Sequence, residues 1–242
     1  MLRGLYAAAS ALDVAEQKQE VQAYNLAHMS TPGYRQRGLT YESFDRVLGR
    51  TQEPTGDIVG AKIAAVYHDF RPGALQGTGH PFDLALTEPD QFFEVAGPNG
   101  PLYSRNGTLR LSTDGRIVTE SGYALTGVAG PITVPAGTSN VNIAGDGNVT
   151  GDGAQLGRVR FAAFADAKQL TAVGPTLYSA SPEAGVRTVE GRVLQGYRET
   201  ANVNPAEAMT GLIVSARYYE AAQRALRTIA ESVQLNTRPS GS

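Results

Sequence analysis

The chain contains no cysteine and no tryptophan among its 242 residues. The absence of cysteine excludes disulfides, thiolate metal sites and cysteine nucleophiles. The absence of tryptophan, with aromatic residues at only 7%, is unfavourable for a sugar-binding surface, because such surfaces use exposed rings. Neither absence identifies the compartment in which the protein acts.

Charged residues are also scarce. They make up 18% of the chain, the formal net charge is -2, and no long run of either sign occurs. Electrostatics therefore suggest neither nucleic acid nor an anionic membrane as a partner, and we expect other proteins instead. No stretch approaches the ~20 apolar residues of a membrane span. The N-terminus lacks the pattern of a cleaved signal peptide, so we expect any export to bypass that route.

The sequence offers little for a metal site. The three histidines, His28, His68 and His80, lack the spacing of helical metal ligands with a nearby acidic partner. Residues 146–152 begin like a calcium loop, but Gly157 occupies the twelfth place, where a bidentate glutamate belongs. A glycine-rich and aspartate-rich hairpin turn is the better interpretation of that segment.

Motifs of catalysis are missing as well. The chain has no nucleophile elbow, phosphate loop or dinucleotide fingerprint. Glu88, Asp90 and Glu94 could supply an acid/base pair for glycoside cleavage. They alternate at the entry to an expected strand, however, where solvated polar residues are the ordinary outcome. We therefore predict a protein without catalytic residues, cofactor or metal, that is, not an enzyme.

Both ends of the chain carry a seven-residue apolar repeat, interrupted by Glu16, Gln19 and Gln223. The N-terminal seam consists of Leu2, Leu5, Ala9, Leu12, Ala23 and Leu26. The C-terminal seam consists of Met209, Leu212, Ala216, Tyr219, Leu226, Ala230 and Val233. The repeats predict two terminal coiled-coil helices, whose seams must be buried against each other or against neighbouring copies. Assembly is thus a more natural role than catalysis.

Local signals set the ends of these helices. The first should end near His28, because the Ser-Thr-Pro-Gly run over 30–33 cannot continue a helix. The second should begin after Asn204 as the cap, with Pro205 at the first helical position and Glu207 at the third. Its body should extend to about Leu235.

The middle of the chain is typical of β structure. Asn-Gly, Asp-Gly and Ser-Gly dipeptides recur at short spacing from about residue 82 to 197, which predicts short antiparallel strands in meandering hairpins. We expect these hairpins to close as a small barrel or sandwich. The predicted class is α+β. Residues 1–34 and 200–242 should form a terminal helical assembly domain, 35–81 an extended connector with a few strands, and 82–199 the β-rich body.

Short motifs link these parts to a known family. The motif residues are Asn25, Leu26, Ala27, Thr31, Pro32, Gly33 and Tyr34 after the first helix, and Asn202, Val203 and Asn204 before the second. Further matching segments are 78–85, 92–93, 103–107, 114–115, 122–123 and 195–197. In this order, over nearly the whole chain, they resemble the flagellar rod and hook family of axial proteins. Two departures are His28, where the family usually has a second asparagine, and residues 88–91, where it usually has glycines.

The resemblance implies a structural subunit of the bacterial flagellar basal-body rod, the periplasmic drive shaft that transmits torque from motor to hook. It implies export through the flagellar type III apparatus and self-assembly through the terminal helices. The implied partners are copies of itself, other rod, hook and ring proteins, and the export apparatus. The chain is too short for a hook subunit, and both the distal-rod and the adjacent proximal-rod type remain open.

Two other classes of function compete with a rod subunit. One is a secreted β-domain that binds glycans or a surface and is oligomerised by its helices; the other is an enzyme. The seams could also be satisfied entirely by pairing within one subunit. If the seams serve assembly, a chain trimmed to residues 36–200 should stay folded and monomeric, whereas the full chain should polymerise.

Overall fold

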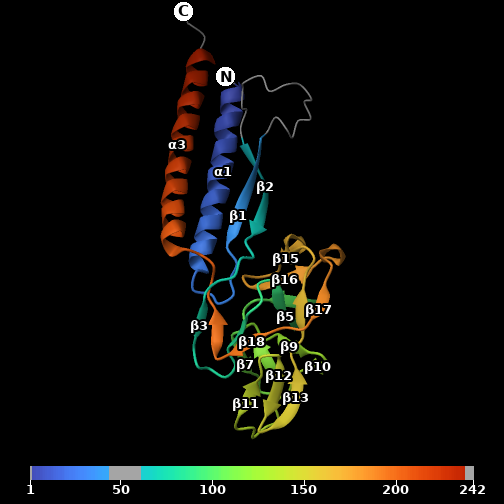
Figure 1. The fold of residues 1–242 in the computed structure, drawn as a ribbon. Helices are drawn as coiled ribbons and strands as arrows, with labels where there is room; N and C mark the ends of the chain where they lie inside the picture. Colours follow the sequence, from blue (N-terminus) through green and yellow to red (C-terminus); the bar gives the residue numbers. More distant parts are fainter. Residues whose placement is uncertain (1, 44–60, 238–242) are drawn as a thin grey trace, which may run out of the picture. The chain divides into compact units, whose positions relative to one another are not determined.

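The computed structural model describes residues 2–43 and 61–237, with the side chains of residues 7–42 and 62–232 (Figure 1). The chain forms two compact units. Unit 1 comprises the described residues of Met1–Ala27, Arg37–His68 and Asn204–Ser242, and unit 2 comprises His28–Gln36 and Asp69–Val203. The described residues confirm the α+β class, with one long helix toward each end of the chain and β structure between them.

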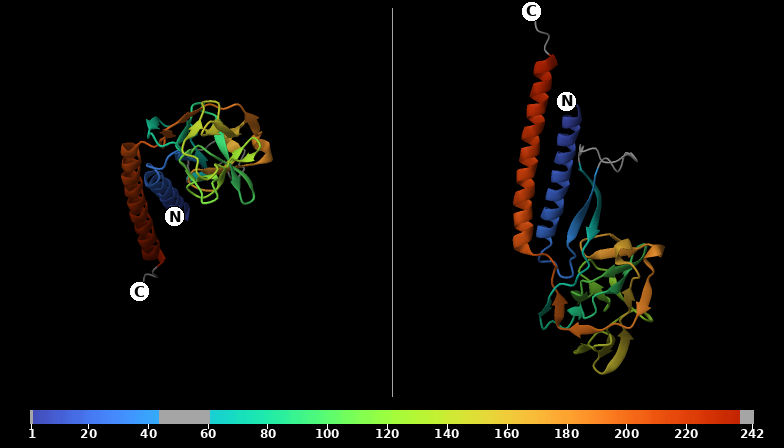
Figure 2. Two further views of the ribbon diagram at one scale, coloured as in Figure 1. Left: turned by 90° about the horizontal axis from the view of Figure 1, so that it is seen from below. Right: turned by 45° about the horizontal axis from the view of Figure 1, so that its top comes forward.

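Unit 1 consists of two helices and a hairpin. The helices are α1 (Leu2–Ala27) and α3 (Pro205–Thr237), and the hairpin pairs β1 (Arg37–Ser43) with β2 (Ala61–His68). The helices run antiparallel, and α1 lies between α3 and the hairpin (Figures 1 and 2). Among the described residues, α1 therefore has neighbours on two sides, whereas α3 packs mainly on α1.

The helix ends follow the sequence signals. The Asn204 side-chain oxygen accepts a hydrogen bond from the Ala206 amide at 3.1 Å, which confirms Asn204 as the cap ahead of Pro205. Helix α1 ends at Ala27, and the Thr31 amide then donates to the His28 carbonyl at 2.9 Å. Both helices are thus bounded within about two residues of the positions that their caps and breakers predict.

Unit 2 is built from short strands, and every strand pairing among the described residues is antiparallel, as predicted. The largest sheet has the order β15-β16-β6-β5-β9-β8-β7, with β14 joining β5 to β17 and β10 pairing with β9. Its strands are β5 (Gln91–Gly97), β6 (Gly100–Ser104), β7 (Leu109–Leu111), β8 (Ile117–Thr119), β9 (Ala124–Gly127), β10 (Gly130–Pro131), β14 (Phe161–Ala163), β15 (Leu170–Ala172), β16 (Leu177–Ala180) and β17 (Arg187–Val189).

Three smaller sheets complete the unit, in the orders β11-β12-β13, β18-β4 and β19-β3. Their strands are β3 (Leu75–Gly77), β4 (Leu84–Leu86), β11 (Val141–Ile143), β12 (Asn148–Gly151), β13 (Ala154–Arg158), β18 (Val193–Gln195) and β19 (Tyr197–Glu199). Strands β18 and β19 return the chain to β4 and β3, so the C-terminal end of unit 2 is anchored beside its N-terminal end.

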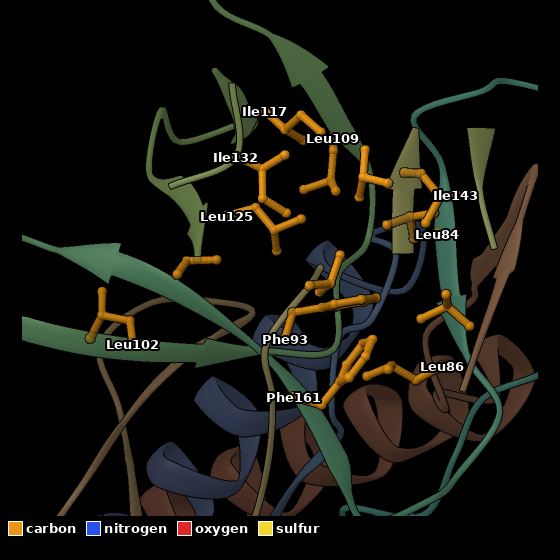
Figure 3. Close-up of a cluster of buried hydrophobic side chains, with 14 of the residues drawn as sticks. Leu84, Leu86, Phe93, Leu102, Leu109, Ile117, Leu125, Ile132, Ile143 and Phe161 are labelled. Carbon is orange, nitrogen blue, oxygen red and sulfur yellow. The ribbon is translucent and has the colours of Figure 1, made fainter. Parts of the chain in front are cut away.

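Strand β5 separates two apolar cores, because consecutive side chains of a strand point to opposite faces. Phe93 belongs to the main core, where its ring centroid lies 6.1 Å from that of Phe161 (Figure 3). Phe92 belongs to a second core and makes an edge contact with Phe164, with centroids 5.2 Å apart. Residues 91–95 of β5 are therefore all buried, because the strand is covered on both faces.

Residues 35–81, which the sequence predicts as an extended connector, divide between the two units. Residues 37–68 lie in unit 1, where the β1–β2 hairpin packs on α1, and residues 69–81 lie in unit 2, where β3 pairs with β19. The part predicted at 44–60 lies outside the described residues.

Candidate assembly site

On the face that α3 turns toward α1, the fully buried residues are small. Ala208 and Ser215 are buried there, and a Cβ added at Gly211 would come within 3.0 Å of the Gln22 side chain. From the predicted C-terminal seam, Leu212, Ala216, Tyr219 and Leu226 are half-buried, whereas Met209 and Ala230 are exposed. The contact uses the predicted row of Leu212, Tyr219 and Leu226. Its second row contains Ala208 and Ser215, each one residue before the predicted Met209 and Ala216.

Helix α1 shows the same one-residue offset. Ala8 and Ala15 are buried, and Leu12 and Leu26 of the predicted seam are half-buried. Ala9 and Ala23 are exposed, so they lie outside the contact made within one chain. The side chains of the remaining seam residues lie outside those described; they are Leu2, Leu5 and Val233.

Large apolar side chains of α3 face solvent. They are Met209 (50% exposed), Ile213 (57%), Val214 (39%) and Tyr218 (63%). At about 100° of rotation per residue, the first two lie on one flank of the helix and the last two on the other. The ridge between the flanks carries exposed polar residues such as Thr210 and Arg217. Within one chain, the fully buried residues of α3 are thus small, whereas several of its large apolar residues are exposed.

Asn25 ties the end of α1 to the start of the hairpin. Its side-chain oxygen accepts a hydrogen bond from the Arg37 amide at 2.8 Å, and its side-chain nitrogen donates to the Arg37 carbonyl at 2.9 Å. The Arg37 guanidinium lies over the Tyr24 ring, 3.6 Å from its centroid. Asn25 is fully buried, so this motif residue acts as a fixed strand partner for Arg37.

The Thr-Pro-Gly motif forms a compact turn in unit 2. The His28 ring stacks on the Tyr34 ring with centroids 5.3 Å apart, and the Tyr34 amide donates to the Thr31 carbonyl. Gly33 has a φ of 68°, and its amide donates to the Glu199 carbonyl at 2.8 Å. His28 therefore contributes an aromatic contact at the position where the family usually has asparagine.

A buried carboxylate, Glu199, joins three distant segments of unit 2. Its Oε1 accepts hydrogen bonds from Arg35 Nη2 at 2.6 Å and from the Gly73 amide at 2.8 Å. Its Oε2 accepts one from Arg105 Nε at 2.9 Å. Burial lowers the pKa of the Arg105 guanidinium, and the negative Glu199 opposes that shift. No local pattern in the sequence predicts a role for Arg35, Arg105 or Glu199. The available signal is the position of Arg105, a charged residue, inside the matching segment 103–107.

Asn202 makes a second link between the same parts of the chain. Its side-chain oxygen accepts the Gln36 amide at 2.7 Å, and its nitrogen donates to the carbonyls of Asp69 at 2.8 Å and Arg71 at 2.9 Å. Val203 beside it is buried. The second family motif therefore holds the chain in position just before the cap of α3.

The residues considered for other chemistry do not converge. Among residues 2–43 and 61–237, no group of three or more His, Cys, Asp or Glu side chains could hold a metal ion. The carboxylate of Asp152 accepts the amides of Ser139 and Asn140, which agrees with a turn. Glu88 and Asp90 are exposed, as expected. Glu94 is instead buried, because β5 is covered on both faces, and it is paired with Arg160 at 3.4 Å. The contacts of Asp152 and Glu94 thus stabilise the fold and do not form a catalytic or metal-binding group.

Comparison with known proteins gives consistent matches along the chain. Residues 88–151 match the family model described as the flagellar hook protein FlgE/F/G D1 domain, and residues 194–235 match the flagellar basal body rod FlgEFG protein C-terminal model. The flagellar basal-body rod protein FlgG of Agrobacterium fabrum is 30% identical, over 97% of this chain and 98% of that protein. The chain belongs to the family of flagellar basal-body rod proteins. Rod protein FlgF of Salmonella typhimurium is also 30% identical, over 96% of each chain, and FlgG of Borreliella burgdorferi is 29% identical over 94% and 95%.

Membership in the rod protein family confirms the resemblance seen in the motifs. The relatives are structural proteins of the flagellar basal body, which decides against the enzyme and the glycan-binding domain. No helix in the described part of this rod protein is long and apolar enough to cross a membrane. The matched regions include strand β5, part of each core, and the stretch from Leu194 in β18 to residue 235 in α3.

Proposed function

We propose that copies of this rod protein assemble through their terminal helices into the axial drive shaft that transmits torque from motor to hook. The observation that carries the proposal is the exposure of Met209, Ile213, Val214 and Tyr218 on α3, while small residues occupy its contact with α1. Burying apolar area stabilises an interface by about 25 cal/mol per Å². The large side chains are thus in position to contribute when neighbouring subunits cover them.

The arrangement on α3 suits a filament. An apolar flank on each side of a polar ridge allows one helix to contact two neighbours at once. Contacts between different surfaces of identical subunits generate open helical assemblies when the rotation does not close. On α1, the exposed alanines Ala9 and Ala23 of the predicted seam would permit a close approach of a neighbouring helix. Both predicted seams therefore keep a proposed role in contacts between copies.

Several finer features belong to the same proposal. The helix pair would supercoil as a coiled coil, and the β body would close as a small barrel or sandwich outside the helical tube. The domain boundaries would be those predicted, with the helical ends as the assembly domain. The subunit would leave the cytoplasm through the flagellar export apparatus without a cleaved signal peptide. In the periplasm it would contact other rod, hook and ring proteins.

The test replaces one residue of a flank in the full chain. We expect Ile213→Asp to abolish polymers in electron micrographs and sedimentation, because a charge would be buried at the interface. Circular dichroism should show an unchanged helix content. The matched control is Thr210→Asp, which puts the same charge on the polar ridge and should leave polymers intact. Normal polymers of Ile213→Asp, or equal loss in both variants, would contradict assembly through the flanks.

A further inference from the structure

Four peptide connections join unit 1 to unit 2, at residues 27/28, 36/37, 68/69 and 203/204. These four connections are the covalent route by which force on one unit reaches the other. Three segments of unit 2 contain the residues next to them: 28–36, 69–73 and 199–203. We call the residues Tyr34, Arg35, Gln36, Asp69, Glu199 and Asn202 the junction cluster.

The junction cluster links all four connections within unit 2, three of them by hydrogen bonds and the first by a ring contact. The Gln36 carbonyl accepts the Asp69 amide at 2.8 Å, which joins the second and third connections directly. Asn202 binds the Gln36 amide with its oxygen and the Asp69 carbonyl with its nitrogen, which adds the fourth connection. The Asn202 amide donates to the Tyr34 carbonyl at 3.4 Å, and Tyr34 stacks on His28 at the first connection.

Buried charge reinforces the junction cluster. Arg35 is fully buried, and its Nε and Nη1 atoms have no hydrogen-bond partner among the residues that the structure describes. Its bond to Glu199 is therefore the main compensation for its charge. Glu199 also binds the Gly73 amide, in the segment that begins at Asp69. Separating any one of these segments from the others would therefore leave a buried charge or a buried amide without its hydrogen-bond partner.

We propose that Asn202 and Glu199 are positioning residues for torque transmission, which make the four connections respond to force as one unit. This rests on the proposed function as a drive shaft. Without links between them, the segments next to the four connections would separate from unit 2 one at a time under force. Segments that are hydrogen-bonded to one another in a buried cluster share the force and separate together. The cluster thereby keeps unit 2 from unravelling at its ends when the helices are loaded.

The first experiment measures hydrogen exchange of backbone amides in the full chain and in Asn202→Ala. The decisive amides are those of Asp69, which donates to the Gln36 carbonyl, and Thr200, which donates to the Ala74 carbonyl. Neither of these N–H groups is hydrogen-bonded to the Asn202 side chain. Loss of the three side-chain bonds of Asn202 should speed the exchange of both amides about tenfold or more. The control Asn148→Ala also removes a turn asparagine of unit 2 and should leave both amides unchanged.

Acceleration of the Gln36 amide alone, which loses its own acceptor, would overturn the proposal. If Asn202→Ala does not fold, Asn202→Asp replaces it, since aspartate keeps the volume and an acceptor for Gln36 but loses the two donated bonds. That variant should accelerate Asp69 and Thr200 as well. Unchanged exchange of both amides in Asn202→Asp would equally overturn coupling of the connections.

The second experiment pulls single full-length molecules. The chain lacks cysteine, so Glu220→Cys on α3 and Glu120→Cys after β8, both at exposed residues, give two unique attachment points. We expect one rupture in this parent, and in Asn202→Ala a lower rupture force preceded by a short release from residues 199–204. The same force and no early release would refute the mechanical role. Both experiments use isolated molecules, so a failure of Ile213→Asp to block assembly would be a separate result.

Discussion

Arg35 and Glu199 lie 164 residues apart in the sequence and form an ion pair inside unit 2, with 2.6 Å between Nη2 and Oε1. Their side chains are 0% and 1% exposed. The second oxygen of Glu199 binds Arg105, whose side chain is also 1% exposed. One carboxylate therefore compensates the charges of two buried guanidinium groups.

Replacing Glu199 by glutamine should destabilise the protein strongly. The variant keeps the shape of the side chain but leaves Arg35 and Arg105 buried without their anion, and breaking a buried ion pair in this way costs about 3–5 kcal/mol. The measurement is the free energy of unfolding of the full chain in urea, followed by circular dichroism. Unchanged unfolding in Glu199→Gln would show that the network contributes nothing to stability.

Glu190→Gln is the matched control for that substitution. The Glu190 side chain is 90% exposed and lies 3.8 Å from Arg158, so solvent screens the pair. Exposed pairs of this kind contribute about 1 kcal/mol or less. A loss as large as that of Glu199→Gln would indicate a general response to removing charge from unit 2.

The boundaries of a stable β fragment should follow the junction cluster. A chain trimmed to residues 36–200 loses Tyr34 and Arg35, both fully buried, and also Asn202. We therefore expect the fragment 28–203 to unfold cooperatively at higher temperature than the fragment 36–200. Differential scanning calorimetry of the two fragments checks this expectation. Equal transition temperatures would mean that the segments 28–35 and 201–203 add no stability to unit 2.

The sequence predicts the features of this fold that depend on neighbouring residues better than those that depend on pairing between distant segments. Asn204 and Pro205 set the start of α3 because capping involves only neighbouring residues. The strand-forming run over 156–164 is divided between β13 and β14, because its two halves pair with different partners. A run of strand-forming residues does not reveal which strands it will pair with.

The helical seams show the same limit. The row of Leu212, Tyr219 and Leu226 is apolar and was predicted, whereas the second row of the contact contains Ser215, which a search for apolar residues passes over. Of the junction cluster, only Tyr34 and Asn202 stand out in the sequence, as motif residues, and the contacts among the members are not predicted. Its residues are polar and far apart in sequence, and their pairing depends on a topology that returns β18 and β19 to the start of unit 2.

His68 should make the stability of the protein depend on pH. Burial, together with the positive charge of Arg37, lowers the pKa of His68 from 6.5 to about 4. Between these two pH values the unfolded chain binds a proton that the folded chain does not, so stability present above pH 6.5 is lost as the pH falls toward 4. Titration of the His68 ring by NMR should give the lowered pKa.

Unfolding midpoints supply the matching test for His68. The difference in stability between pH 7 and pH 4.5 should be smaller in His68→Gln than in the parent. An NMR pKa of His68 near 6.5, or equal pH dependence of stability in the two proteins, would rule out the effect.

Gly33 of the Thr-Pro-Gly motif should tolerate no side chain. It has a φ of 68°, where an L-residue costs about 1–2 kcal/mol. A Cβ there would also lie 2.4 Å from the Asn106 amide nitrogen and 2.6 Å from the Arg105 carbonyl carbon, so the backbone itself would have to move. Gly122 separates the two effects, because its φ is 85° and a Cβ would meet nothing within 4 Å. Gly33→Ala should therefore lower the unfolding free energy by clearly more than Gly122→Ala, and equal losses would show that the close approach to residues 105–106 is unimportant.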